Sequence, residues 1–74
     1  MNLNTKEFTL YYWNINYPPG TPVRYWSVKG NQSYVDTVTR SVAWKLSNGE
    51  ILVKIDGQSG GVSINHLMPL GEEN

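Results

Sequence analysis

The segment Tyr-Pro-Pro-Gly-Thr-Pro-Val-Arg-Tyr-Trp, residues 17–26, restricts the fold more than any other part of the chain. Its three prolines fix the φ angle and remove backbone N–H donors, so a helix cannot pass through it. After the last proline, apolar and polar residues alternate from Val23 onward, which is the two-residue period of a strand with one buried face. The segment therefore predicts a sharp turn followed by a strand over 23–28.

Residues 5–16, before this turn, are predicted to form a short amphipathic helix. The apolar residues that recur at helical spacing are Phe8, Tyr11, Tyr12 and Ile15. Asn4 followed by Glu7 has the spacing of a capping box, and Pro18 ends the helix because it forces the preceding residue to be extended. Phe8, Leu10 and Tyr12 also alternate, and the aromatic content is typical of a strand, so a strand is the alternative interpretation.

The remaining chain predicts short strands joined by turns. A long strand over 34–46 is rich in strand-forming residues, but its alternation breaks, which indicates a bulge or sharp bend midway. Asn48-Gly49 between apolar residues is a strong hairpin signal. The strand that returns over 51–55 is expected to bury its odd-numbered positions.

A short strand over 62–64 and a tight turn over 65–68 complete the pattern. Together these elements predict a mainly β fold, a small SH3-like barrel of about five strands with a short N-terminal helix. We expect a single domain over 1–74, made of a helical cap over 5–16, the barrel over 21–70 and a disordered polar tail over 71–74.

Composition narrows the classes of partner. The 74 residues include no cysteine, so disulfides and thiolate metal sites are excluded. Three Trp and five Tyr in so short a chain make a homo-oligomer one expected way to bury aromatic surface. The formal net charge is zero, which makes nucleic acid an unlikely partner. No apolar run suits a signal peptide or a membrane span, so we expect a cytoplasmic protein with no membrane contact.

The candidate binding residues are Arg24, Trp26, Arg40, Trp44 and His66. Trp and Arg dominate the energetically important positions of protein interfaces. Arg24 and Trp26 are expected on one strand face, while Arg40 and Trp44 lie on the long second strand. The competing interpretation is that the tryptophans pack in the core while the arginine heads reach water. His66 more often closes a loop by a local hydrogen bond than contributes a polar contact to a binding groove.

No arrangement of residues indicates catalysis. Asp36, Glu50 and Asp56 form no recognisable carboxylate pair, and the glycine-rich run over 57–61 lacks the ending of a phosphate loop. A single histidine without cysteines cannot form the usual metal-ligand set or a catalytic triad. We therefore predict no catalytic residues, no metal and no cofactor.

A series of short motifs resembles a family of small proteins encoded mainly by phages, prophages and other mobile elements. The motifs that occur in the same order are Trp13-Asn14, Tyr17-Pro18, Gly20-Thr-Pro-Val-Arg-Tyr-Trp26, Thr39-Arg40-Ser41, Ala43-Trp44, Gly60-Gly61 and His66-Leu67. The resemblance implies a mobile-element origin and a helix before Pro18, and it implies no particular activity. The aromatic run over 10–12 departs from the more ordinary helical face of that family.

The run over 61–65 has a looser similarity to the last strand of the plasmid-borne type II dihydrofolate reductases. Those SH3-like barrels assemble four copies around a shared pore lined by Val-Gln-Ile-Tyr. In this chain Ser63 and Asn65 replace the Gln and the Tyr, so half the motif is absent. The similarity implies an oligomeric shared-pore enzyme as an alternative function.

The sequence thus predicts a non-enzymatic binding module of mobile-element origin that binds a host or phage protein. The first alternative is the shared-pore enzyme. The second is binding of single-stranded nucleic acid, for which Arg24, Trp26 and Arg40 would supply stacking and phosphate contacts.

Overall fold

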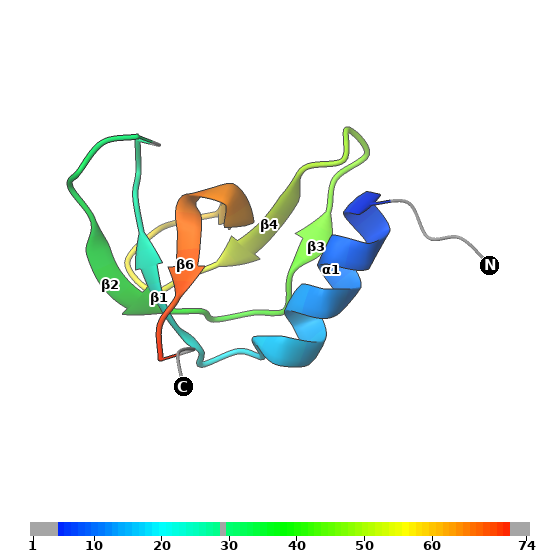
Figure 1. Cartoon of the computed structure of the whole chain (residues 1–74), viewed down its shortest axis with the longest axis horizontal. Helices are drawn as coiled ribbons and strands as arrows, with labels where there is room; N and C mark the ends of the chain where they lie inside the picture. Colours follow the sequence, from blue (N-terminus) through cyan, green and yellow to red (C-terminus); the bar gives the residue numbers. More distant parts are fainter. Residues whose placement is uncertain (1–4, 29, 72–74) are drawn as a thin grey trace.

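One helix and two three-stranded antiparallel sheets make up the computed structural model, which describes residues 5–28 and 30–71 (Figure 1). The helix α1 spans Thr5–Asn16, and the first sheet has the order β2-β1-β6, with β1 at Pro22–Tyr25, β2 at Val35–Val38 and β6 at Leu67–Pro69. The second sheet has the order β3-β4-β5, with β3 at Trp44–Lys45, β4 at Ile51–Lys54 and β5 at Gly61–Ser63. The mainly β fold with an N-terminal helix is confirmed, and the described strands form no closed barrel.

The segment before the prolines is a helix and not a strand. Its last hydrogen bond runs from Tyr17 N–H to Trp13 O at 2.7 Å, and Pro18 follows directly. The Asn14 amide fixes the helix to the rest of the chain, because its Nδ2 donates to Ala43 O at 3.1 Å and its Oδ1 accepts from Ala43 N–H at 2.8 Å. The expected cap at Asn4 lies outside the described residues.

The long strand expected over 34–46 is bent, as its broken alternation predicted. β2 ends at Val38, Thr39 forms a single bridge to Ile55, and pairing resumes only at β3. Between the two strands, Ser41 Oγ accepts a hydrogen bond from Lys54 N–H at 3.1 Å. A side-chain oxygen thus takes the place of a backbone partner, which lets the chain turn from one sheet into the other.

The hairpin between β3 and β4 forms where Asn48-Gly49 predicted it. Gly49 has φ +93°, a conformation that side-chain-bearing residues rarely adopt, and Leu46 N–H donates to Glu50 O at 2.8 Å across the turn. The odd-numbered positions of the returning strand are buried, as expected, at Ile51, Val53 and Ile55.

Two of the strands have other boundaries than predicted. β1 ends at Tyr25, short of residue 28, because a turn begins at Val28, whose carbonyl accepts from Asn31 N–H at 3.0 Å. The strand expected over 62–64 is displaced by one residue, since Ile64 starts the 3-10 turn η1 at Ile64–His66. Ser63 caps that turn by accepting from Asn65 N–H at 3.2 Å. The strand β6 that follows was not predicted.

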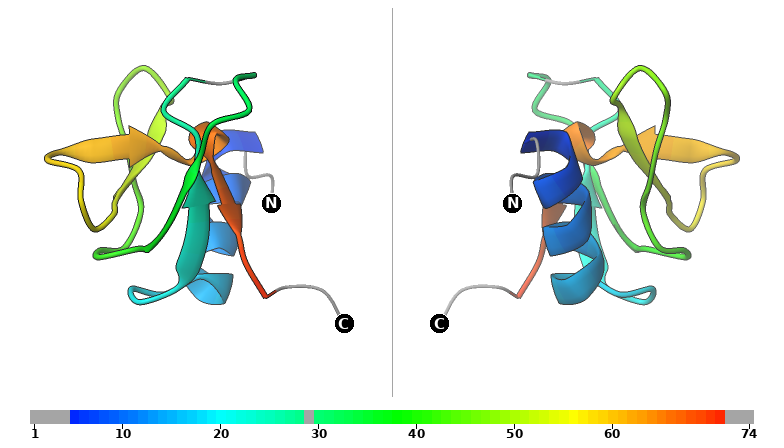
Figure 2. Two further views of the ribbon diagram at one scale, coloured as in Figure 1. Left: turned by 90° about the vertical axis from the view of Figure 1, so that its left-hand side faces the viewer. Right: turned by 90° about the vertical axis from the view of Figure 1, so that its right-hand side faces the viewer.

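The core lies between α1 and the two sheets. Its buried apolar members are Trp13, Tyr17, Val23, Ala43, Ile51, Val53 and Ile55. Thr39 is the buried polar side chain among the described residues, and it accepts from Thr21 N–H at 3.1 Å and donates to Pro18 O at 3.2 Å. Figure 2 shows the yellow turn between β4 and β5 projecting to the side away from α1.

Candidate functional site

The outer face of the β2-β1-β6 sheet carries a group of aromatic, charged and thioether side chains. Its members, which we call the outer-sheet site, are Arg24, Trp26, Tyr34, Asp36 and Met68. Arg24 stands opposite Asp36 on β2 and opposite Met68 on β6, so these three side chains share one face. Trp26 follows two residues after Arg24 and its ring lies 5.8 Å from the ring of Tyr34. The strand register therefore assembles the site from three separate segments.

Arg24 is held in one position by two neighbours. Its Nε and Nη2 donate to the two carboxylate oxygens of Asp36 at 2.8 and 3.2 Å, and its guanidinium lies 4.0 Å from the centre of the Tyr34 ring. The hydrogen bonds from Arg24 lower the pKa of the Asp36 carboxyl below its ordinary value of 3.8. The same hydrogen bonds raise the pKa of Arg24. The cation is thus oriented and paired before any ligand binds.

Trp26 and His66 meet at the end of this face. His66 Nδ1 lies 2.7 Å from Trp26 O, and Trp26 N–H donates to His66 O at 3.0 Å. Because a carbonyl oxygen only accepts, Nδ1 must carry the hydrogen, which leaves Nε2 of the neutral ring as an acceptor. A depression of about 310 Å³ adjoins the pair, lined by Trp26, Gly30, Asn31, Asn65 and His66. His66 thus closes a loop locally, as expected of a lone histidine, and also borders the depression.

Arg40 does not join this group. It follows Thr39 at the bend, its side chain is 60% exposed, and its Nε lies 3.7 Å from Asp56 Oδ1. Its backbone N–H donates to Lys54 O at 2.7 Å. Arg40 therefore belongs to the junction between the two sheets, with its side chain in solvent.

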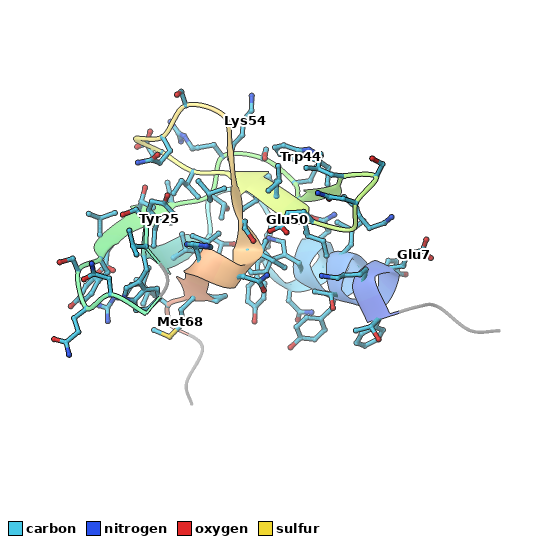
Figure 3. The ribbon with its side chains drawn as sticks, turned by 90° about the horizontal axis from the view of Figure 1, so that it is seen from above. Glu7, Tyr25, Trp44, Glu50, Lys54 and Met68 are labelled. Carbon is cyan, nitrogen blue, oxygen red and sulfur yellow. The ribbon has the colours of Figure 1, made fainter. Side chains whose placement is uncertain are left out.

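Trp44 is also separate, and it packs within the second sheet. It is half-buried and stands opposite Leu52 on β4. A Cβ placed on Gly61 would come within 2.7 Å of Trp44 Cη2, so the indole ring lies directly over the backbone of β5. Figure 3 shows Trp44 well away from Tyr25 and Met68 of the first sheet. Trp44 shares the face of Leu52, opposite the buried face of Ile51 and Val53, so the indole covers the outside of the second sheet and is not part of the core.

Three members of the outer-sheet site were not among the predicted site residues. Tyr34 and Asp36 alternate with Val35, so their spacing indicated that they share a face of the second strand. The sequence carried no signal for how that strand aligns with β1, because the intervening loop has no standard hairpin length. Met68 lies on β6, a strand that the sequence did not indicate.

The segment over 61–65, which is similar to the pore strand of the reductases, makes contacts within its own chain. Val62 stands opposite Val53, and both Val62 and Ile64 pack against the core. Ser63 caps η1, and Asn65 is exposed. Within residues 5–28 and 30–71, no three His, Asp or Glu side chains are grouped closely enough to hold a metal ion.

Comparisons with models of protein families, with curated proteins and with solved structures found no match to this chain. The resemblances to mobile-element proteins and to the type II reductases therefore stay predictions, as do the domain division and the location in the cell. None of the described helices has the length and apolar character needed to cross a membrane.

Proposed function

We propose that this chain is a non-enzymatic binding module that recognises another protein through its outer-sheet site. The observation that carries the proposal is the pre-organised cluster of Arg24, Trp26 and Tyr34. Its guanidinium and aromatic rings are fixed by mutual contacts at 4.0 and 5.8 Å. Side chains that are already ordered lose little conformational entropy on binding, which lowers one of the costs of forming an interface.

The residue types of the site suit a protein partner. Tyr34 and Met68 are 49% and 44% exposed, so they offer apolar area, and Trp26 is half-buried beside them. Tryptophan, tyrosine and arginine are the residues whose loss weakens protein interfaces most. The depression next to Trp26 adds amide and imidazole groups from Asn31, Asn65 and His66 that can orient a bound segment by hydrogen bonds.

The charge pairing favours a protein over single-stranded nucleic acid. Arg24 is neutralised by Asp36, and Arg40 faces Asp56. Nucleic-acid affinity depends on positive charge that is free to displace counterions from phosphates. Neither arginine offers such charge without first losing its carboxylate partner. The best ligand is therefore a neutral or weakly charged protein segment with an apolar side chain for the Trp26–Tyr34 surface.

The proposal is tested with two alanine variants and one matched control. The immobilised wild-type chain is used to capture proteins from a bacterial extract, and each captured protein is then purified and titrated calorimetrically. Tyr34→Ala and Arg24→Ala should each weaken binding by roughly 30-fold, the effect of losing about 2 kcal/mol at a central interface residue. Arg40→Ala is the control, since Arg40 is also paired with an aspartate but lies outside the site.

Two outcomes would contradict the proposal. One is a captured protein whose affinity is the same for the wild type, Tyr34→Ala and Arg24→Ala. The other is retention of single-stranded DNA at low salt that disappears in Tyr34→Ala, since that result would assign the site to nucleic acid. Tyr34 is half exposed, so its replacement should leave the fold intact, as circular dichroism can verify.

We also propose that the two sheets are the halves of an SH3-like barrel in a protein of mobile-element origin. The support for the barrel is topological: β2 and β3 follow one bent segment that contributes to both sheets, and η1 stands between β5 and β6. The support for the origin is the motif resemblance alone. Amide hydrogen exchange tests the barrel assignment: protection of residues 39–43 as strong as that of β2 and β3 would support it, and rapid exchange there would contradict it.

A further inference from the structure

The helix α1 has two apolar faces, although a surface helix normally has one. The inner face contributes Trp13 to the core, with Leu10 packed against it, and Tyr17 joins the core directly after the helix. The outer face consists of Phe8, Tyr11, Tyr12 and Ile15, which we call the outer stripe. These four residues are between 49% and 63% exposed. The periodicity that predicted the helix therefore belongs to the solvent-facing side, and the core is built from the other side.

The outer stripe is large for a chain of this size. A side chain of this type covers about 200 Å², so the exposed fractions of the four leave roughly 450 Å² of connected apolar surface. The largest apolar patch on an ordinary monomer measures about 300–600 Å² and is often an interaction site. In this chain of 74 residues, an apolar patch of that size lies on the single helix α1.

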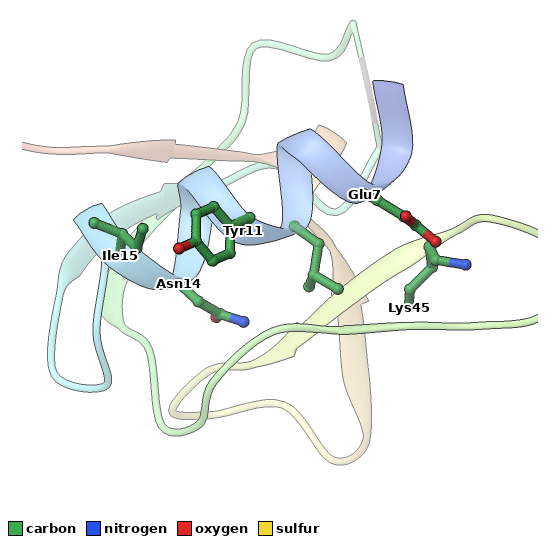
Figure 4. A pocket seen from close by; sticks show the side chains of 6 residues that line it. Glu7, Tyr11, Asn14, Ile15 and Lys45 are labelled. Carbon is green, nitrogen blue, oxygen red and sulfur yellow. The ribbon is translucent and has the colours of Figure 1, made fainter. Parts of the chain in front are cut away.

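A groove runs beside the stripe and extends the same surface (Figure 4). It has a volume of about 540 Å³ and is lined by Glu7, Leu10, Tyr11, Asn14, Ile15 and Lys45. Glu7 and Lys45 lie toward one end of it, and Ile15 lies toward the other. Tyr11 and Ile15 belong to both the groove and the outer stripe. A row of aromatic side chains from another molecule that packs on the stripe can therefore also reach into the groove.

We infer that the outer stripe pairs with the outer stripe of a second copy of this chain, with the two α1 helices antiparallel. The spacing of the stripe is self-complementary. A two-fold axis midway between Tyr11 and Tyr12 sets each Tyr11 against Tyr12 of the other copy. The same axis sets each Phe8 against Ile15 of the other copy. Every member of the stripe then has an apolar partner.

Area and charge both suit a second copy. Two stripes bury roughly 900 Å² between them, and the adjoining groove residues bring the total toward the 1,200 Å² of the smallest specific interfaces. The charged residues of α1, Lys6 and Glu7, both lie in its first turn. These two charges are of opposite sign and cancel, so the helix dipole sets the preference: an antiparallel pair places the partly positive N-terminus of each helix beside the partly negative C-terminus of the other, whereas a parallel pair would place the two N-termini together. The chain has a formal net charge of zero, so two copies do not repel each other over distance.

The outer-sheet site stays open in such a pair. Figure 1 shows α1 at one end of the molecule and β2 at the other, with β3 and β4 between them. The dimer is therefore independent of the proposed function, and either proposal can fail without the other.

The test is a sedimentation and light-scattering series on the full chain across a wide concentration range. We expect the mass to rise from 8.4 kDa to twice that value. Tyr11→Lys places a charge at the centre of the stripe, and Ile15→Lys places one near its end. Each should weaken dimerisation at least about 30-fold. Both positions are more than 60% exposed, so the monomer should keep its fold.

Val28→Lys is the matched control. Val28 is 59% exposed, much like Tyr11, but it lies in the loop after β1 and should leave the dimer unchanged. A chain that remains monomeric at every concentration would overturn the inference. So would a dimer that tolerates both lysine variants, or one that Val28→Lys disrupts as strongly.

The antiparallel arrangement is tested by thiol crosslinking, since the chain contains no cysteine of its own. Phe8→Cys and Ile15→Cys are prepared separately and treated with a short bifunctional thiol reagent. A mixture of the two variants should crosslink efficiently, and each variant alone should not. Efficient crosslinking of either variant alone would rule out the antiparallel pair.

Discussion

Arg24 with Trp26 and Arg40 with Trp44 are the same two residue types in two regions of the chain, yet they have different surroundings. Arg24 and Trp26 lie at β1 and its end, where register brings Tyr34 and Asp36 beside them. Arg40 and Trp44 are separated by the irregular segment between β2 and β3, so the rule that alternate residues share a face does not connect them. All four residues were predicted from their types, but only Arg24 and Trp26, at a regular strand, are brought together with further side chains.

The difference depends on the bend at Thr39, and the largest effect is expected there. Thr39→Val keeps the shape of the side chain but removes its hydrogen bonds to Thr21 and Pro18. Two lost buried hydrogen bonds should lower the free energy of unfolding by about 2 kcal/mol, measured by urea denaturation. The control is Thr37→Val, which removes a single, solvent-exposed hydrogen bond from the Thr37 hydroxyl to Asp56 O. This variant should lower the free energy of unfolding by only about 0.5 kcal/mol. Equal losses in the two variants would show that the bend does not depend on the Thr39 hydroxyl.

The packing role of Trp44 is tested at the glycine beneath it. Gly61→Ala places a methyl group 2.7 Å from Trp44 Cη2 and 3.1 Å from Leu52 Cβ, so the ring must move. We expect a loss of about 1 kcal/mol of unfolding free energy. The same substitution in a Trp44→Leu background should cost clearly less, because the smaller side chain leaves room. An unchanged cost in that background would mean that the strain arises elsewhere.

Local signals explain which parts of the fold could be predicted. Pro18 ended the helix at the expected place, and Asn48-Gly49 formed the expected hairpin. The broken alternation over 34–46 marked a real bend. Each of these features depends on the backbone preferences of a few adjacent residues, which a single sequence contains.

Non-local pairing explains what could not be predicted. β6 is three residues long and exists because it pairs with β1, more than forty positions earlier in the chain. The candidate site depends on the same kind of information, since Asp36 and Met68 reach Arg24 only through strand register. The helix adds a different difficulty. With apolar residues on both faces, its periodicity could not tell which face would be buried.

The smallest expected effect concerns the ion pair that fixes Arg24. The pKa of Asp36 lies below 3.8, chiefly because Arg24 donates hydrogen bonds to it. The pair therefore stabilises the fold at pH values above 3.8, and this contribution is lost as the pH falls through the pKa of the folded state. Arg24→Gln should raise the Asp36 midpoint in a carboxyl NMR titration, whereas Arg40→Gln should leave it unchanged. An Asp36 midpoint that does not respond to Arg24→Gln would show that the pair is not formed in solution.

The change in the free energy of unfolding should be slight, because Asp36 is exposed and water screens such pairs. The ion pair thus orients the guanidinium over Tyr34 and contributes little to the stability of the fold.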